Sequence, residues 1–138
     1  MNILVVDDDS DDIMLFTEAF GTLYPSSTIY RASNGIEGLQ MAQKVLPNIV
    51  FLDINMPIMN GRETLLSIRK DSLLKNLTIC MLSTTSNWDE IQWCYNAGAD
   101  GFVIKPPSFE GLCISLKNFV QLHVTAAFKS STRGDQLS

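Results

Sequence analysis

The chain has 138 residues, an apolar content of 46% and a formal net charge of −5, which is enough for one domain with a core of its own. The acidic balance argues against direct nucleic-acid binding, which needs a basic face. No apolar run approaches the roughly 18 residues that span a bilayer, and no basic segment opens the chain, so we expect a cytoplasmic protein without a membrane segment. The three cysteines fit no zinc or redox spacing and are expected to be reduced, and a single histidine, His123, leaves little scope for histidine-based catalysis.

Short apolar runs and helix-period segments alternate through the first third of the chain. Residues 3–6 form an apolar run that predicts a strand, and apolar side chains spaced by 3, 4 and 3 residues over 13–23 predict the helix that follows. Residues 28–30 predict a short second strand. The next helix is expected between Gly35 and Pro47.

The same alternation continues to the end of the last helical stripe. A buried strand is predicted at 49–52, followed by loop residues and a third helix, and a fourth strand is predicted at 78–82. Asn87 with Glu90 resembles a capping box at the start of a fourth helix. A fifth strand at 101–104 precedes a last helix, whose apolar residues again recur at spacings of 3, 4 and 3.

Strands that are apolar on both faces and alternate with helices are typical of a parallel sheet that is covered on both sides. We therefore predict an α/β fold: a doubly wound, five-stranded parallel sheet with helices on both faces. This single domain is expected to occupy residues 1–125. The polar residues 126–138 are expected to be a short disordered tail.

Charged or hydroxyl side chains stand directly after four of the predicted strands. Because ligands bind beyond the carboxyl ends of the strands in such sheets, these side chains should meet on one rim. Two carboxylates about 5 Å apart repel by roughly 3 kcal/mol at an effective dielectric of about 20, so a hard cation such as Mg²⁺ is expected among the acids. A cation and a lysine beside a buried aspartate indicate a phosphoryl-transfer site. The residues are Asp7, Asp8 and Asp9 after the first strand, Asp53 after the third, Ser83 and Thr84 after the fourth, and Lys105 after the fifth.

Three acids at or near this rim, Asp9 among them, have a simpler interpretation. Asp9, Asp11 and Asp12 lie where the first helix is predicted to begin, and acidic residues are common helix caps. We therefore interpret these three as capping residues rather than as parts of the site.

In this order, the rim residues resemble the receiver domain of two-component response regulators. The resemblance covers residues 1–125 and implies a flavodoxin-like (βα)₅ fold. It also implies a single-domain signalling switch, which is not an enzyme but assists its own phosphorylation and dephosphorylation. The segments that carry it are Val5-Val6-Asp7-Asp8, Leu52-Asp53-Ile54-Asn55-Met56-Pro57 with Gly61, Leu82-Ser83-Thr84, and Lys105-Pro106.

The resemblance implies a role for each matching residue. Asp53 is the phosphoacceptor, and Ser83 and Lys105 contact the phosphoryl group. Mg²⁺, or Mn²⁺ in its place, is bound by Asp7, Asp8, Asp53 and the backbone carbonyl of Asn55. Ser83, Thr84 and Phe102 form the switch, and Pro57, Gly61 and Pro106 are structural, with a cis bond expected between Lys105 and Pro106. Thr84 stands where a small residue is usual, which leaves the lifetime of the phosphoryl group open.

The resemblance also implies partners. A sensor histidine kinase or a histidine phosphotransfer protein would supply the phosphoryl group, and an unknown protein target would bind the face formed by the fourth helix, fifth strand and fifth helix. Direct nucleic-acid and membrane binding are not expected, and a homodimer is left open. Trp88 and Trp93, near the fourth helix, are candidates for a partner contact.

The rim residues also allow two other interpretations. The first is a phosphatase of the haloacid dehalogenase type, with Asp7 as nucleophile, but Ser10 and further acids follow Asp9 and there is no cap insertion. The second is a receiver fold that binds partners without phosphorylation. Acetyl phosphate labelling separates all three readings, because only a receiver switch takes the label on Asp53.

Overall fold

Strands and helices alternate along the chain as the sequence predicts, and the computed structural model describes residues 1–125. The tail predicted at 126–138 lies outside the described residues. The strands are β1 (Asn2–Val6), β2 (Thr28–Ala32), β3 (Ile49–Asp53), β4 (Thr78–Ser83) and β5 (Gly101–Ile104). The helices are α1 (Ser10–Leu23), α2 (Gly35–Val45), α3 (Gly61–Lys70), α4 (Trp88–Asn96) and α5 (Phe109–Val120), and a π-helical turn, η1 (Gln121–Thr125), extends the last of them.

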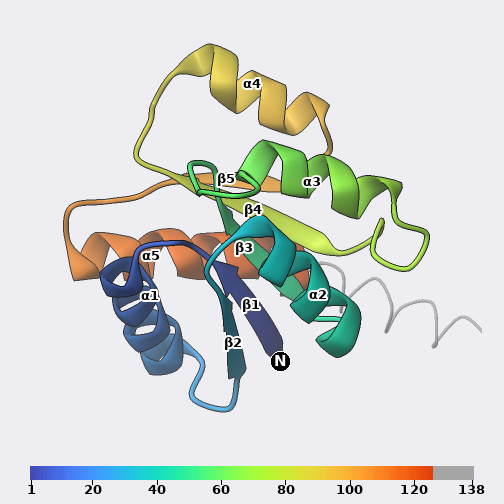
Figure 1. The fold of residues 1–138 in the computed structure, drawn as a ribbon. Helices are drawn as coiled ribbons and strands as arrows, with labels where there is room; N and C mark the ends of the chain where they lie inside the picture. Colours follow the sequence, from blue (N-terminus) through green and yellow to red (C-terminus); the bar gives the residue numbers. More distant parts are fainter. Residues whose placement is uncertain (126–138) are drawn as a thin grey trace, which may run out of the picture.

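The five strands form one parallel sheet in the order β2-β1-β3-β4-β5. Helices α1 and α5 cover one face of this sheet, and α2, α3 and α4 cover the other (Figure 1). The chain reverses its direction of strand addition between β1 and β3, so the switch point of the sheet lies there. The predicted doubly wound α/β fold, of flavodoxin-like type, is thus confirmed.

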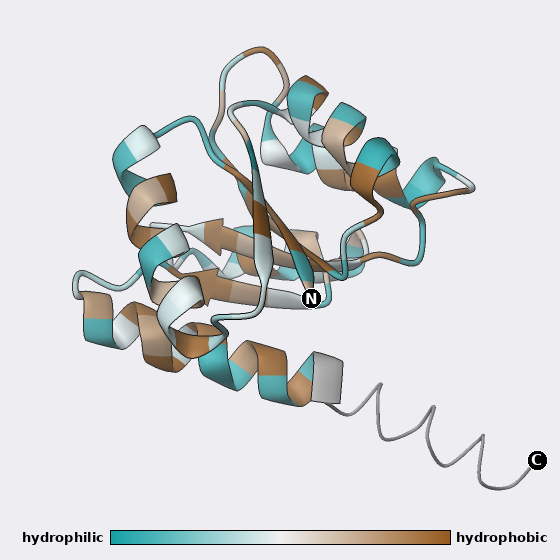
Figure 2. Cartoon of the chain, turned by 90° about the horizontal axis from the view of Figure 1, so that it is seen from below, coloured by the Kyte–Doolittle hydropathy of each residue, from teal (hydrophilic) through white to brown (hydrophobic). Residues whose placement is uncertain are grey.

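Two apolar clusters form because neighbouring side chains of a strand point to opposite faces of the sheet. On β1, Ile3 and Val5 face α1 and α5, whereas Leu4 and Val6 face α2 and α3. The apolar residues lie on the strands and on the inner sides of the helices (Figure 2). Helix α4 has the fewest buried residues of the five α-helices, Cys94 alone.

Helix starts follow from short polar caps. Asp9 caps α1 by accepting the backbone N–H groups of Asp11 and Asp12, so of the three acids interpreted as caps only Asp9 is one. The predicted capping box on α4 is half formed. Asn87 accepts the N–H of Glu90 at 3.2 Å, but the Glu90 carboxylate pairs with an arginine of α3. Caps on the other helices are Asn34, Asn60 in a full box with Glu63, and Ser108.

The structure also places the cysteines and the single histidine, and it bears on membrane spans. None of the helices in residues 1–125 is both long and apolar enough to cross a bilayer. Cys80, Cys94 and Cys113 are free thiols, the first two of them buried, which agrees with the expected reduced cysteines. His123 stacks on the ring of Phe119, away from the rim, with 4.2 Å between the ring centroids.

Candidate functional site

Acidic side chains lie at the switch point of the sheet, where β1 and β3 end side by side. Asp7 follows β1 and is 2% exposed, and Asp53 is the last residue of β3 and is 8% exposed. Asp8 is exposed beside them. One carboxylate oxygen of each of these three residues lies within 4.8 Å of the other two. The structure therefore brings together the acids that the sequence places on one rim.

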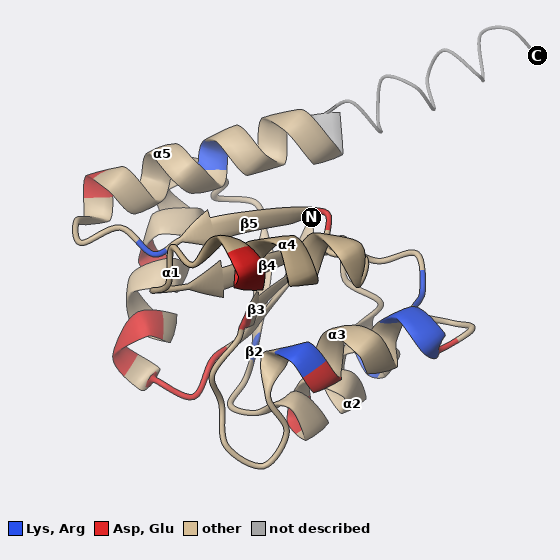
Figure 3. Cartoon of the chain, turned by 90° about the horizontal axis from the view of Figure 1, so that it is seen from above, with Lys and Arg blue, Asp and Glu red and all other residues tan. Residues whose placement is uncertain are grey.

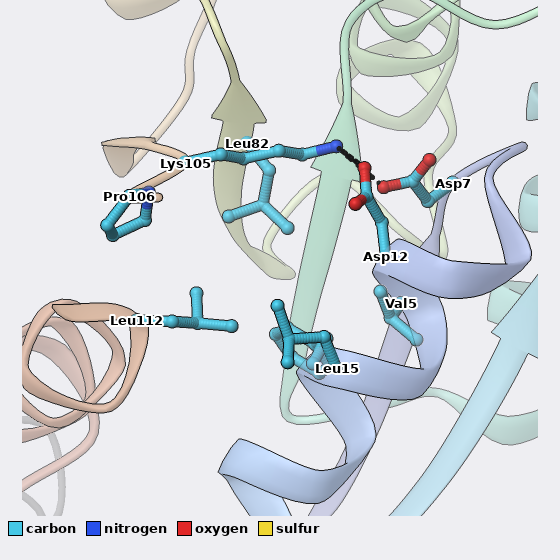
Figure 4. A pocket seen from close by; sticks show the side chains of 9 residues that line it. Val5, Asp7, Asp12, Leu15, Leu82, Lys105, Pro106 and Leu112 are labelled. Carbon is cyan, nitrogen blue, oxygen red and sulfur yellow. Dashed lines mark hydrogen bonds and ion pairs between the residues drawn. The ribbon is translucent and has the colours of Figure 1, made fainter. Parts of the chain in front are cut away.

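Lys105 reaches this cluster from the end of β5. Its Nζ lies 2.8 Å from Asp7 Oδ2, 2.9 Å from Asp12 Oδ2 and 3.2 Å from Asp53 Oδ1. Figure 4 shows its side chain extended across the sheet edge toward Asp7 and Asp12. Three acids thus surround one ammonium group, and Asp12 is one that sequence reasoning assigned elsewhere.

One feature of the sequence indicates that Asp12 could contact Lys105. Asp12 lies in the first turn of α1, and that turn follows the rim directly. Acidic residues gather in this turn and in the loop that leads to it (Figure 3). Whether such a residue caps the helix or turns toward the site depends on how α1 packs, which the pattern does not specify.

Burial controls the electrostatics of the cluster. It raises the pKa of Asp53 from 3.8 to about 6, since the favourable charge of Lys105 is partly offset by the charges of Asp7 and Asp8. Burial alone would lower the pKa of Lys105, but the hydrogen bonds to Asp7 and Asp12 and the charge of Asp53 hold it above its ordinary value. The cluster therefore has an excess of negative charge that one lysine does not neutralise.

The cluster fits a small divalent cation. At a metal–oxygen distance of about 2.1 Å, neighbouring ligands of octahedral Mg²⁺ lie about 3.0 Å apart and opposite ligands about 4.2 Å apart. Oxygens of Asp7, Asp8 and Asp53, each within 4.8 Å of the other two, are close enough to share one cation if the side chains draw together. All three donors are carboxylate oxygens, which hard cations prefer, and Asn55 lies exposed two residues after Asp53.

The end of β4 is joined to the end of β5 beside the cluster. Ser83 is 1% exposed, its hydroxyl accepts the N–H of Thr85 at 3.1 Å, and its carbonyl accepts the N–H of Lys105 at 2.7 Å. Thr84 is exposed at the rim. Phe102 is half-buried against the α2–α3–α4 side of the core. A movement of Ser83 would therefore be transmitted directly to the backbone of Lys105.

The loop between β3 and α3 packs tightly against Asp53. Gly61 donates its N–H to the carbonyl of Ile54 at 2.8 Å, and a Cβ there would lie 2.7 Å from Ile54 Cα and overlap the carbonyl of Asp53. The structural role predicted for Gly61 thus has a steric basis. Earlier in the loop, the Pro57 carbonyl accepts the N–H of the second residue after it at 2.7 Å, which places Ile58 at a φ of 69° with 76% of its surface exposed.

The prediction of a cis peptide bond between Lys105 and Pro106 is wrong. All peptide bonds in residues 1–125 are trans, including the one between Lys105 and Pro106. The trans form is favoured by about 0.5–1 kcal/mol even before proline. In this geometry the Lys105 side chain reaches all three acids, so the ammonium position does not require the cis form.

The chain matches the family model of the response regulator receiver domain over residues 3–117. It therefore belongs to the receiver domains of two-component response regulators. Among curated proteins it is 31% identical over 129 residues to the transcriptional regulatory protein PrrA of Mycobacterium leprae, covering 94% of this chain and 54% of that protein. It is 33% identical over 106 residues to the chemotaxis protein CheY-3 of Vibrio cholerae, covering 77% of this chain and 81% of that one.

Solved structures show the same fold. CheY4 of Vibrio cholerae superposes with a TM-score of 0.76 at 29% identity, over 86% of this chain and 97% of that one. A phosphorylated cyanobacterial phytochrome response regulator, RcpA, superposes with a TM-score of 0.82 at 25% identity, over 91% and 94%. The chain spans about half the length of the first curated relatives that it matches. The family match favours the receiver reading over the dehalogenase-type phosphatase.

Proposed function

We propose that this domain is a switch that accepts a phosphoryl group on Asp53 and signals by protein contact. The observation that carries the proposal is the burial of Asp53 among Asp7, Asp8 and Lys105, with its pKa raised to about 6. A related structure, CheY of Borrelia burgdorferi, was solved with CheX, BeF₃ and Mg²⁺, and it superposes with a TM-score of 0.77 at 27% identity. That relative supports Mg²⁺ as the cofactor of this chain, although Mn²⁺ would suit the same oxygens.

The proposed donor is a phosphohistidine of a sensor kinase or a phosphotransfer protein. A carboxylate oxygen of Asp53 bonds to phosphorus while the P–N bond breaks, and its electron pair stays on the imidazole nitrogen. Lys105 holds one phosphoryl oxygen, and the buried Ser83 hydroxyl donates to another. A cation bound by Asp7, Asp8, Asp53 and the Asn55 carbonyl would neutralise phosphoryl charge. The chain is thus a phosphoacceptor rather than an enzyme with an external substrate, acting in the cytoplasm.

The proposed output surface is the face formed by α4, β5 and α5. Phosphorylation adds a charge of about −1.5 to −2 and three acceptor oxygens. Ser83, and Thr84 with it, would move toward the phosphoryl group. The side chain of Phe102 on β5 would then rotate toward the interior of the protein. Because α4 has a single buried side chain, it can respond at little cost. The groove beside Phe102, of about 410 Å³, also includes Tyr95 and Ile104 and offers a partner an apolar surface.

The two tryptophans differ in their suitability for a partner contact. Trp93 is half-buried and carries the guanidinium of Arg62 at 4.9 Å from its ring centroid, so it also serves the packing of α4 on α3. Trp88 is 71% exposed at the first position of α4. We therefore favour Trp88 over Trp93 as the residue that meets the downstream protein.

Labelling tests the proposal. Incubation with acetyl phosphate and Mg²⁺, followed by peptide mass mapping, should place one phosphoryl group on Asp53 and none on the Asp53→Asn variant. EDTA should prevent labelling. A label on Asp7 would favour the phosphatase reading, and no label on wild type would favour a receiver fold that acts without phosphorylation.

A further inference from the structure

Asp12 is the acid at this site to which the proposed function gives no role. It lies in the first turn of α1, with 42% of its side chain exposed, and its Oδ2 is 2.9 Å from Lys105 Nζ. We propose that Asp12 is a positioning residue: together with Asp7 it fixes the ammonium of Lys105 beside Asp53, with the remaining N–H left for the phosphoryl group. The inference rests on the proposed function and adds a residue to it.

The geometry of an ammonium group supports this role. It has three N–H donors in a tetrahedral arrangement, so fixing the direction of two also fixes the third. The two shorter contacts of Lys105, 2.8 Å to Asp7 and 2.9 Å to Asp12, are with residues that do not accept the phosphoryl group. The longer contact, 3.2 Å, is with the proposed acceptor Asp53. The lysine is thus held from the side of α1 and presented to the acceptor.

Asp12 is also the anchor that a metal would leave in place. Asp7 belongs to the carboxylate cluster and would share its oxygens with a bound cation, which weakens its hold on Lys105. Asp12 lies outside that cluster of three. With metal bound, Asp12 is therefore the carboxylate that keeps Lys105 in position while the phosphoryl group arrives.

The surroundings of the Asp12–Lys105 pair limit where the lysine could turn. A small cavity of about 50 Å³ lies beside the pair, which is enough for one or two water molecules. An ammonium group would not move into such an apolar space, because burying a charge without a partner is costly. A lysine released by Asp12 would instead turn to solvent. The cavity is lined by Phe16 and by the apolar residues labelled in Figure 4, which are Val5, Leu15, Leu82, Pro106 and Leu112.

The chain supplies a matched control in Asp11. It lies in the same turn, is exposed and carries the same charge, and among residues 1–125 its carboxylate makes no hydrogen bond or ion pair. Asp11→Ala therefore measures the effect of removing one acid near an anionic donor, which should leave labelling equal or slightly faster. Asp12→Ala removes the same charge and the Lys105 contact as well.

The experiment compares initial rates of Asp53 labelling by acetyl phosphate with Mg²⁺, in variants shown to be folded by thermal denaturation. We expect Asp12→Ala to be slower than Asp11→Ala by on the order of tenfold, less than the roughly hundredfold that a misplacement of about 1 Å can cost, because Asp7 still holds Lys105. Asp12→Glu, which keeps the charge, should recover part of the rate. The side-chain ¹⁵N signal of the Lys105 ammonium, measured without metal, should shift in Asp12→Ala and stay unchanged in Asp11→Ala.

The outcomes separate the inference from the function on which it rests. Equal rates in Asp12→Ala and Asp11→Ala, with wild type labelled normally, would overturn the positioning role alone. An unmoved Lys105 signal in Asp12→Ala would overturn it as well. Absence of label on wild-type Asp53 would overturn the proposed function and the inference with it, before any variant is compared.

Discussion

Replacing Asp53 by asparagine should stabilise the metal-free protein at neutral pH. Burial raises the pKa of Asp53 from 3.8 to about 6, so between these values the folded protein binds a proton that the unfolded chain releases. Stability from this group is therefore fully present below about pH 4, falls as the pH rises toward 6, and stays low above it. Asparagine occupies nearly the same volume without a charge and avoids this loss.

The size of the effect follows from the shift. A difference of about two pH units corresponds to roughly 3 kcal/mol at 1.36 kcal/mol per unit. Loss of the ion pair between Lys105 and residue 53 should cost the variant little stability, because Lys105 keeps Asp7 and Asp12 as partners. We expect Asp53→Asn to raise the free energy of unfolding at pH 7.5 by on the order of 2–3 kcal/mol.

Urea denaturation in EDTA between pH 4 and pH 8 measures this difference in stability. A shift of the urea midpoint reports a change in the free energy of unfolding when the dependence on urea concentration is the same in both proteins. Wild type should lose stability between pH 4 and 6 relative to Asp53→Asn. As a control, Asp89→Asn removes an exposed acid from the first turn of α4 and should change stability by less than about 1 kcal/mol. Adding Mg²⁺ should stabilise wild type more than the variant and narrow the difference. If Asp53→Asn is no more stable than wild type at pH 7.5 in EDTA, the argument from buried charge is wrong.

Three further predictions concern the loops and the metal. Ile58→Asn should stabilise the protein by about 1 kcal/mol in thermal denaturation, because a β-branched residue at positive φ is strained and an exposed side chain contributes little packing in return; an unchanged melting temperature would contradict it. Gly61→Ala should cost roughly 1–3 kcal/mol, since its Cβ has no space, whereas Gly21→Ala, with nothing within 4 Å, should be neutral or stabilising; equal effects would count against the steric account. Asp8→Asn should weaken Mg²⁺ binding by roughly tenfold or more in calorimetry, and Asp11→Asn much less; similar losses in both would mean that the metal responds to overall charge alone.

Much of the fold could be predicted because β1, β3, β4 and β5 are short, largely apolar runs. Strands were expected at 49–52 and 78–82. β3 and β4 occupy those positions, and each extends one residue further at its carboxyl end. The convergence of Asp53 and Lys105 followed from one rule, that parallel strands end on the same side. Apolar runs do not specify which strands pair, so the strand order follows only through the flavodoxin-like fold that the resemblance implies.

The features that were missed depend on packing rather than on pattern. Asp12 was interpreted as a helix cap, and only the angle at which α1 leaves the rim turns its side chain toward Lys105. Glu90 has the spacing of a capping box, yet Arg62 on the neighbouring helix competes for its carboxylate at 3.1 Å. The positive φ of Ile58 is set by the closure of a loop, where no local preference of isoleucine would place it.

Because α4 buries so little, the free energy needed to move it should be small. Helix α1 buries four side chains, whereas α4 buries Cys94 alone. Its amide hydrogens should therefore exchange with solvent at a lower opening free energy than those of α1. Reversing a two-state population from 1:99 to 99:1 takes about 5.5 kcal/mol, and a loosely held element lets a single new charge supply much of that. A loosely held α4 should sample alternative positions in the resting protein, so a partner that prefers the position favoured by phosphorylation would in turn favour the phosphorylated form.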